Sequence, residues 1–295
     1  MLTLRDIIFA VGLPAVWTGV VLLIAWRPWR VQGLPPSGFW SGPVALAGSF
    51  LWAFLGASGP PQFPPIQVTD WLPFIAVVAA VIGLADSTLE IPRGVKWATG
   101  CLCIALATWM LIRPLPAETH SQTTKLSWLA MRAIVWGGCW IAIERQAIKY
   151  TGSAIPRDLL IVTSATALVL VMSASKLLGL LAGSLAASLA VFVAVGYFTS
   201  LSMARGSVLV LLTLLSGLLI CGLFYAFLSR PNALLLLLSV VLTALSRLGR
   251  LGHLQGWKRH SVQLAFAAIP AVIAVILAVT DFAASMSEGS GDYGY

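Results

Sequence analysis

Long apolar runs, separated by short polar or proline-rich breaks, recur along the whole chain. Runs such as residues 208–228 are apolar on every face of a helix and do not alternate apolar with polar positions. A membrane-spanning helix needs about 20 mostly apolar residues, whereas the strands of a membrane barrel alternate. The pattern therefore predicts an all-α fold, a polytopic integral membrane helix bundle. About ten transmembrane helices are expected, at residues 7–26, 43–57, 71–85, 97–112, 126–143, 159–174, 177–199, 208–228, 233–245 and 262–280.

Breaks in the pattern decide how the apolar runs are divided. Residues 159–200 are too long for one crossing at about 1.5 Å per residue, so the polar residues 173–176 are expected to join two helices. Residues 59–65 contain four prolines and cannot continue a helix. Residues 1–284 thus form one transmembrane domain. The small, acidic and glycine-rich residues 285–295 are expected to form a disordered tail.

The composition supports a membrane protein and argues against bound metals. Of 295 residues, 59% are hydrophobic and 9% are charged, against about 25% charged in soluble proteins. All four cysteines lie inside apolar runs without chelating spacing, so we expect small core side chains. The three histidines do not form a metal-binding pattern, and no cofactor is expected. The cysteines are Cys101, Cys103, Cys139 and Cys221.

Lys and Arg fall into two unequal groups in alternate loops. Twelve lie on one side of the expected bundle and six on the other. Cytoplasmic loops carry an excess of Lys and Arg, so the twelve are expected in the cytoplasm and both termini on the non-cytoplasmic side. The twelve are Arg27, Arg30, Arg93, Lys96, Arg145, Lys149, Arg157, Arg205, Arg247, Arg250, Lys258 and Arg259.

The net charge of +8 is explained by these loops. We expect them to meet anionic lipid head groups of the bilayer, and no nucleic acid partner is predicted. In residues 247–254 leucines lie three apart between basic residues, which favours a segment lying along the membrane surface. The expected location is a cell membrane of the bacterial inner-membrane type. Other membrane proteins are also possible partners, and the sequence does not identify them.

Arg132 is the strongest candidate for a functional side chain, because ionisable groups within the hydrocarbon are costly. It lies nearly two turns into the predicted helix 126–143, with Trp128 and Trp136 one turn away on either side. Arg132 either faces the other helices, where it is placed to bind an anionic solute, or extends to the head groups at the helix end. In the first case the backbone near Gly137 and Gly138 allows close approach.

A second cluster of charges follows the third predicted helix. Asp86 and Glu90 are four residues apart, with Arg93 and Lys96 close behind. They share one helix face if that helix continues far enough, and such a cluster suits phosphate binding or proton transfer. The alternative is a solvated loop, which Pro92 and Gly94 favour. The pairs Glu144-Arg145 and Arg157-Asp158 are expected on the same side of the membrane, where they either join this cluster or have ordinary structural roles.

The seventh predicted helix carries small residues at a packing spacing. Gly179 and Gly183 are four apart, and Ala187 extends the series. Small residues at this spacing let helix backbones approach closely, so this face is predicted to be buried in the bundle.

Motifs of known membrane enzymes are missing from the sequence. It contains no HExxH helix, no Gly-x-Ser-x-Gly turn and no Walker phosphate loop. A small-solute permease or carrier is therefore the favoured function, and an enzyme is less favoured. Two alternatives stay open, a non-catalytic membrane subunit or scaffold of a larger complex, and a membrane-bound enzyme acting on lipid head groups at residues 86–96.

Overall fold

The computed structural model of the protein describes residues 4–26, 38–89, 91–115, 122–173, 175–199, 201–246 and 256–289. Within these ranges the regular elements are helices and no strand occurs. The structure confirms the predicted all-α, polytopic membrane helix bundle.

In the described residues, nine helices are long and apolar enough to cross a membrane. The first runs without a break through α1 (Leu4–Ile7), the π-helical η1 (Ile8–Gly12) and α2 (Leu13–Trp26). The others are α3 (Ser41–Ser58), α4 (Trp71–Thr88), α5 (Arg93–Ile112), α6 (Gln122–Lys149), α7 (Ala154–Met172), α8 (Lys176–Phe198), α9 (Ser207–Tyr225) and α11 (Gly256–Gly289). Between α9 and α11, the apolar helix α10 (Arg230–Leu245) has 16 residues. At about 24 Å it is shorter than the hydrocarbon core.

Several helices continue through polar residues beyond the ranges predicted for them. The expectation that the fifth helix ends at Glu144 and Arg145 is wrong, because α6 continues to Lys149. Glu144, which lies beyond the predicted range 126–143, is therefore held on a helix. The last helix, α11, continues to Gly289, into the segment expected to be a disordered tail. Residues 290–295 and 247–255 lie outside the described residues, as does Glu90.

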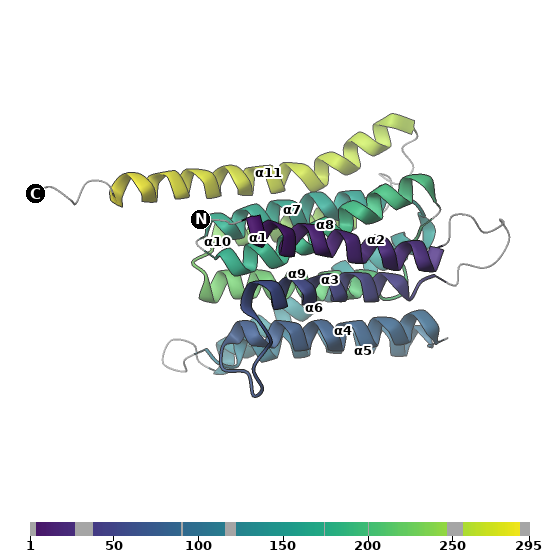
Figure 1. The fold of residues 1–295 in the computed structure, drawn as a ribbon, viewed down its shortest axis with the longest axis horizontal. Helices are drawn as coiled ribbons and strands as arrows, with labels where there is room; N and C mark the ends of the chain where they lie inside the picture. Colours follow the sequence, from purple (N-terminus) through teal and green to yellow (C-terminus); the bar gives the residue numbers. More distant parts are fainter. Residues whose placement is uncertain are drawn as a thin grey trace, which may run out of the picture.

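The helices lie side by side and alternate in direction, as Figure 1 shows. We call the two ends of the bundle the Lys96 end and the Lys176 end, after one lysine at each. At the Lys176 end, Lys176 Nζ pairs with Asp6 Oδ2 at 2.6 Å. The chain begins α1 and completes α11 at this same end (Figure 1), as an even number of crossings requires.

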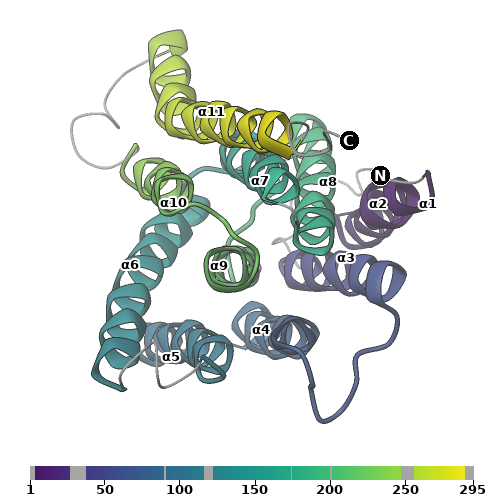
Figure 2. The same cartoon turned by 90° about the vertical axis from the view of Figure 1, so that its left-hand side faces the viewer.

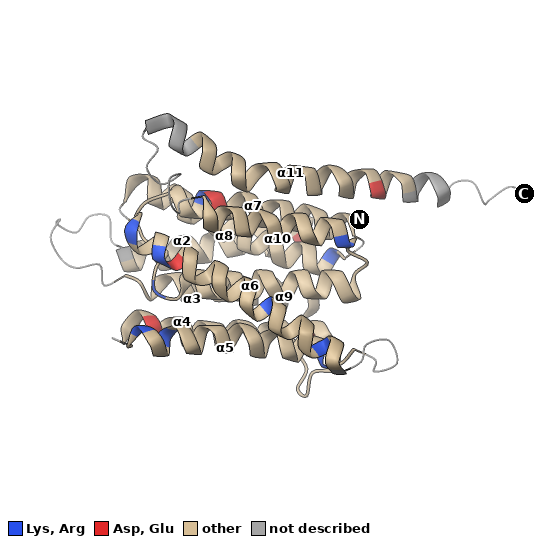
Figure 3. Ribbon diagram, turned by 180° about the vertical axis from the view of Figure 1, so that it is seen from behind, with Lys and Arg blue, Asp and Glu red and all other residues tan. Residues whose placement is uncertain are grey.

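Charged residues gather toward the two ends of the bundle, as Figure 3 shows. Six of the twelve basic residues assigned to one side have described side chains, and all six lie at the Lys96 end. They are Arg93, Lys96, Arg145, Lys149, Arg157 and Arg205.

Helix α9 occupies the centre of the bundle, with seven other helices around it in Figure 2. Of its most apolar stretch, 89% is buried inside the protein, the largest share of any described spanning helix. A helix that is apolar on all sides can be accommodated in lipid or in a protein core. Here it forms the core, and the more polar helices surround it.

The α7–α8 hairpin is packed through Gly179, as predicted, but Gly183 differs. A Cβ at Gly179 would stand against Val171 of α7, whose backbone nitrogen would be 3.1 Å away. A Cβ at Gly183 would meet no heavy atom within 4 Å. Of the two glycines, Gly179 thus makes the close approach and Gly183 does not, so the prediction for Gly183 is wrong.

Candidate functional site

The inward face of α6 carries charged and aromatic side chains at helical spacing. Three of its charged residues are buried, since Lys125 is 6% exposed, Arg132 9% and Glu144 2%. Tryptophans alternate with them every three or four residues, which places them on the same face. These are Trp128, Trp136 and Trp140.

Arg132 lies inside the bundle and does not extend to its surface. Its Nη1 is buried and has no hydrogen-bond partner among the described residues. Its Cζ stands 5.9 Å from the centre of the Trp128 ring, within range of a cation–π interaction. The second tryptophan predicted beside it, Trp136, is 2% exposed. The part of the chain that the structure describes contains four ion pairs, and Arg132 takes part in none of them.

Aromatic residues of α9 pack near the Trp128 ring that lies beside Arg132. The ring of Phe224 packs edge-on against Trp128, with ring centres 5.9 Å apart. One residue further, the Tyr225 hydroxyl donates a hydrogen bond to the Leu111 carbonyl of α5 at 2.9 Å. The guanidinium of Arg132 is therefore held among apolar and aromatic groups near three helices. A planar cation in such surroundings is suited to an anion that carries an apolar body.

A cluster of three charged residues, the Lys96 cluster, joins α4, α5 and α6. Lys96 Nζ lies 2.7 Å from Asp86 Oδ2 and 2.8 Å from Glu144 Oε1. The lysine and Asp86 side chains are 13% and 11% exposed, and that of Glu144 is 2% exposed. With both carboxylates ionised, the cluster carries one excess negative charge.

Glu144 also holds the segment that leads into the central helix. Its Oε1 accepts a hydrogen bond of 2.6 Å from the backbone N–H of Arg205. In the same segment the Ser202 hydroxyl donates to the Ala147 carbonyl at 2.8 Å, and Gly152 N–H donates to the Leu201 carbonyl at 2.6 Å. The other carboxylate oxygen, Glu144 Oε2, is buried without a partner among the described residues.

Two glycines allow this segment to pass close to α4. Gly206 has a positive φ of 93°, which strongly favours glycine. A Cβ on Gly206 would collide with the backbone of Gly83, including its carbonyl oxygen. The start of α9 therefore depends on direct backbone contact with α4, beside the Lys96 cluster.

The structure brings together only some of the charges proposed from the sequence. Asp86 lies on α4, which ends at Thr88 and so stops short of Glu90, and it pairs with Lys96. Arg93 begins α5 with an exposed side chain. Arg157 pairs with its neighbour Asp158 at 3.2 Å. Glu144, one of the residues expected on the side of this cluster, joins it through Lys96. Its bond to the backbone of Arg205 was not predicted.

Arg145 is the next residue after Glu144, but its side chain does not share the buried position of Glu144. Its side chain is exposed, and its Cζ lies 4.6 Å from the centre of the Trp97 ring. The same helix thus carries one exposed and one buried arginine, each near a tryptophan ring.

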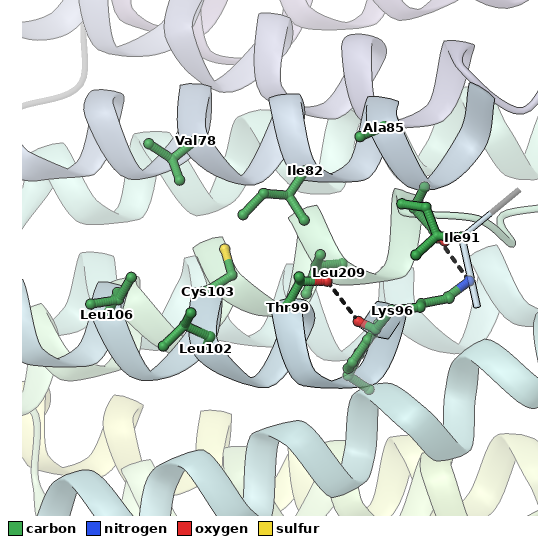
Figure 4. A pocket seen from close by; sticks show the side chains of 12 residues that line it. Val78, Ile82, Ala85, Ile91, Lys96, Thr99, Leu102, Cys103, Leu106 and Leu209 are labelled. Atoms are coloured by element: carbon green, nitrogen blue, oxygen red, sulfur yellow. Dashed lines mark hydrogen bonds and ion pairs between the residues drawn. The ribbon is translucent and has the colours of Figure 1, made fainter. Parts of the chain in front are cut away.

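A groove of about 220 Å³ lies between α4 and α5 and ends at the Lys96 cluster. Figure 4 shows Val78 and Ile82 of α4 on one side and Thr99, Leu102 and Leu106 of α5 on the other. Its remaining lining residues are Ala85, Asp86, Ile91, Lys96, Cys103, Trp140 and Leu209. The lining is almost wholly apolar except at the end that holds Asp86 and Lys96.

Buried charges within long apolar helices, around an apolar central helix, define an integral, multi-pass membrane protein. Neither a protein-family model nor a curated protein sequence matches the chain. In the described residues, no group of three or more His, Cys, Asp or Glu side chains is arranged to hold a metal ion.

Proposed function

We propose that the protein is a permease or carrier for a small organic anion, and that Arg132 binds the anion. The observation that supports this proposal is the burial of Arg132 without a charged partner among the described residues. An arginine side chain stays protonated in proteins, so it cannot avoid this cost by losing its charge. An uncompensated buried charge is strongly unfavourable unless a ligand neutralises it.

The surroundings of Arg132 define the class of solute that we propose. Trp128 and Phe224 offer aromatic faces and edges, which favour an apolar or aromatic body attached to the anionic group. A carboxylate matches the planar guanidinium through two parallel hydrogen bonds. The proposed substrate is therefore a small carboxylate with an apolar body.

We further propose that the protein lies in a cell membrane of bacterial type, with the Lys96 end in the cytoplasm. The supporting observation is the excess of Lys and Arg in the loops of that side. Arg132, on the half of α6 nearer its start at Gln122, then lies in the non-cytoplasmic half of the membrane.

Ligand-induced thermal stabilisation of the purified protein, followed by uptake in proteoliposomes, tests the anion site. Benzoate, acetate, phosphate and chloride serve as probes. A ligand that binds only the folded protein stabilises it by mass action. We expect benzoate to raise the melting temperature most and to enter the proteoliposomes. Arg132→Gln should lose both effects, and Arg132→Lys should lose most of them, because Lys lacks the planar pair of donors.

The matched control is Arg145→Gln, on the same helix and also beside a tryptophan, but exposed. It should retain the stabilisation and the uptake. The proposal is wrong if none of the anions stabilises the parent protein, or if Arg132→Gln responds to benzoate as the parent does.

A further inference from the structure

The groove between α4 and α5 opens on the flank of the bundle. Three of its lining side chains are well exposed there, Val78 by 50%, Leu102 by 57% and Leu106 by 46%. Its floor is buried, with Cys103 at 4% and Trp140 at 1% exposure. Because the flank of a membrane bundle faces lipid, the groove is accessible from the bilayer and not only from water.

We propose that this groove binds one acyl chain of an aminophospholipid, whose head group lies at the Lys96 end. This site is separate from Arg132 and does not depend on transport. The apolar lining suits a hydrocarbon chain. The volume of about 220 Å³ is below the range of roughly 300–1,000 Å³ that drug-sized ligands occupy, so the groove holds part of one acyl chain.

The charges at the end of the groove match a head group that carries both signs. Asp86 pairs with Lys96 through Oδ2, and its Oδ1 has no hydrogen bond to the described part of the chain. This oxygen is available to an ammonium group. Arg93, exposed on the first turn of α5, is available to a phosphodiester, as are the free N–H groups at that helix start.

The balance of these charges favours ethanolamine over other common head groups. The charged residues that the structure describes in the lining of the groove are Asp86 and Lys96, whose charges offset each other. A glycerol head group would leave the lipid phosphate unbalanced beside two carboxylates. A choline head group has no N–H to donate to Asp86, whereas ethanolamine has three.

One residue in the floor of the groove has an unpaired donor. Trp140 lines the groove, and its indole Nε1 is buried without an acceptor among the described residues. It lies four residues, or about 6 Å, along α6 from Glu144. A lipid ester carbonyl lies at a similar depth below its head group.

Photo-crosslinking in nanodiscs tests this assignment. The full-length protein is placed in phosphatidylcholine nanodiscs with a small share of a photoactivatable lipid that carries an ethanolamine, choline or glycerol head group. Crosslinked peptides are then identified by mass spectrometry. We expect the ethanolamine lipid to label α4 and α5 most strongly. Asp86→Asn should reduce its preference over choline by about tenfold, the factor lost with one charge-assisted hydrogen bond.

Two neighbouring valines provide a matched pair of variants. Val78→Trp fills the groove and should abolish labelling there, whereas Val77→Trp, 45% exposed in the parent and outside the groove, should leave it unchanged. Equal labelling by all three lipids, a preference for glycerol, or labelling that survives Val78→Trp would each overturn the proposal. Because labelling needs no solute, these outcomes are independent of the anion site at Arg132.

Discussion

Glu144 on α6 accepts a hydrogen bond from the backbone N–H of Arg205, although the two residues are 61 positions apart in the chain. The same carboxylate oxygen receives the Lys96 ammonium of α5. One buried side chain therefore joins α5 and α6 to the segment that leads into the central helix α9. The energetic consequences of this arrangement can be tested with conservative substitutions.

Glu144→Gln should lower thermal stability more than Asp86→Asn does. Glu144 is 2% exposed and binds both Lys96 and Arg205, whereas Asp86 is 11% exposed and binds Lys96 alone. We expect a loss of about 2–4 kcal/mol for Glu144→Gln and about 1 kcal/mol for Asp86→Asn. Thermal unfolding in mild detergent measures both. Equal losses would mean that the greater burial of the Glu144 charge adds nothing to its contribution.

Replacing each buried cation by methionine should have opposite effects. Lys96→Met leaves two carboxylates without their cation and should destabilise the protein by about 3–5 kcal/mol. Arg132→Met removes a charge that has no ionic partner in the described structure and should stabilise it by about 1–3 kcal/mol. Melting temperatures of the two variants, measured without added anions, show whether each substitution stabilises or destabilises the protein. A destabilised Arg132→Met would indicate that Arg132 contributes to the fold.

Gly206→Ala should be far more damaging than Gly59→Ala. Both glycines have positive φ values, 93° and 81°, so alanine is strained at either position. At Gly206 the added Cβ would also collide with the backbone of Gly83, while at Gly59 it meets no atom within 4 Å. We expect losses of about 3 kcal/mol or more against about 1 kcal/mol. Similar melting curves for the two variants would argue against direct contact between α4 and the start of α9.

The two glycines of α8 should differ when each is replaced by leucine. Gly179→Leu drives a side chain into Val171 and the backbone of α7, so we expect the α7–α8 hairpin to open and stability to fall by at least about 2 kcal/mol. Gly183→Leu has space and should change stability by less than about 1 kcal/mol. Thermal unfolding of both variants shows whether α8 packs closely at Gly179 alone or at Gly183 as well.

Single cysteines introduced at the two ends of the bundle test the proposed orientation. In a variant without the four native cysteines, Gln62→Cys should react with an impermeant thiol reagent in intact cells. Thr151→Cys, exposed at the opposite end, should react only after the membrane is made permeable. Labelling of Thr151→Cys in intact cells would reverse the assignment of the cytoplasmic side.

The sequence alone determined the class of the fold and the division into helices. Few charges and long apolar runs without alternation leave no stable alternative to membrane helices, because backbone groups in lipid must be bonded within a helix or a closed barrel, and barrel strands alternate. The break between α7 and α8 could be placed from the polar residues 173–176, since α7 ends at Met172 and α8 begins at Lys176. Local patterns of this kind depend on residues close together in the chain.

The position of each helix in the bundle was decided only by the tertiary structure. The sequence of α9 is apolar all round, so periodicity could not show whether it faces lipid or the core. For the same reason the sequence could not show which groups Glu144 binds. Its partners Lys96 and Arg205 lie 48 and 61 positions away, and only helix packing brings them to one carboxylate. Arg132 could be singled out from the sequence because charge in an apolar helix is costly wherever it points, but its burial beside Trp128 depends on how α6 is turned toward α9.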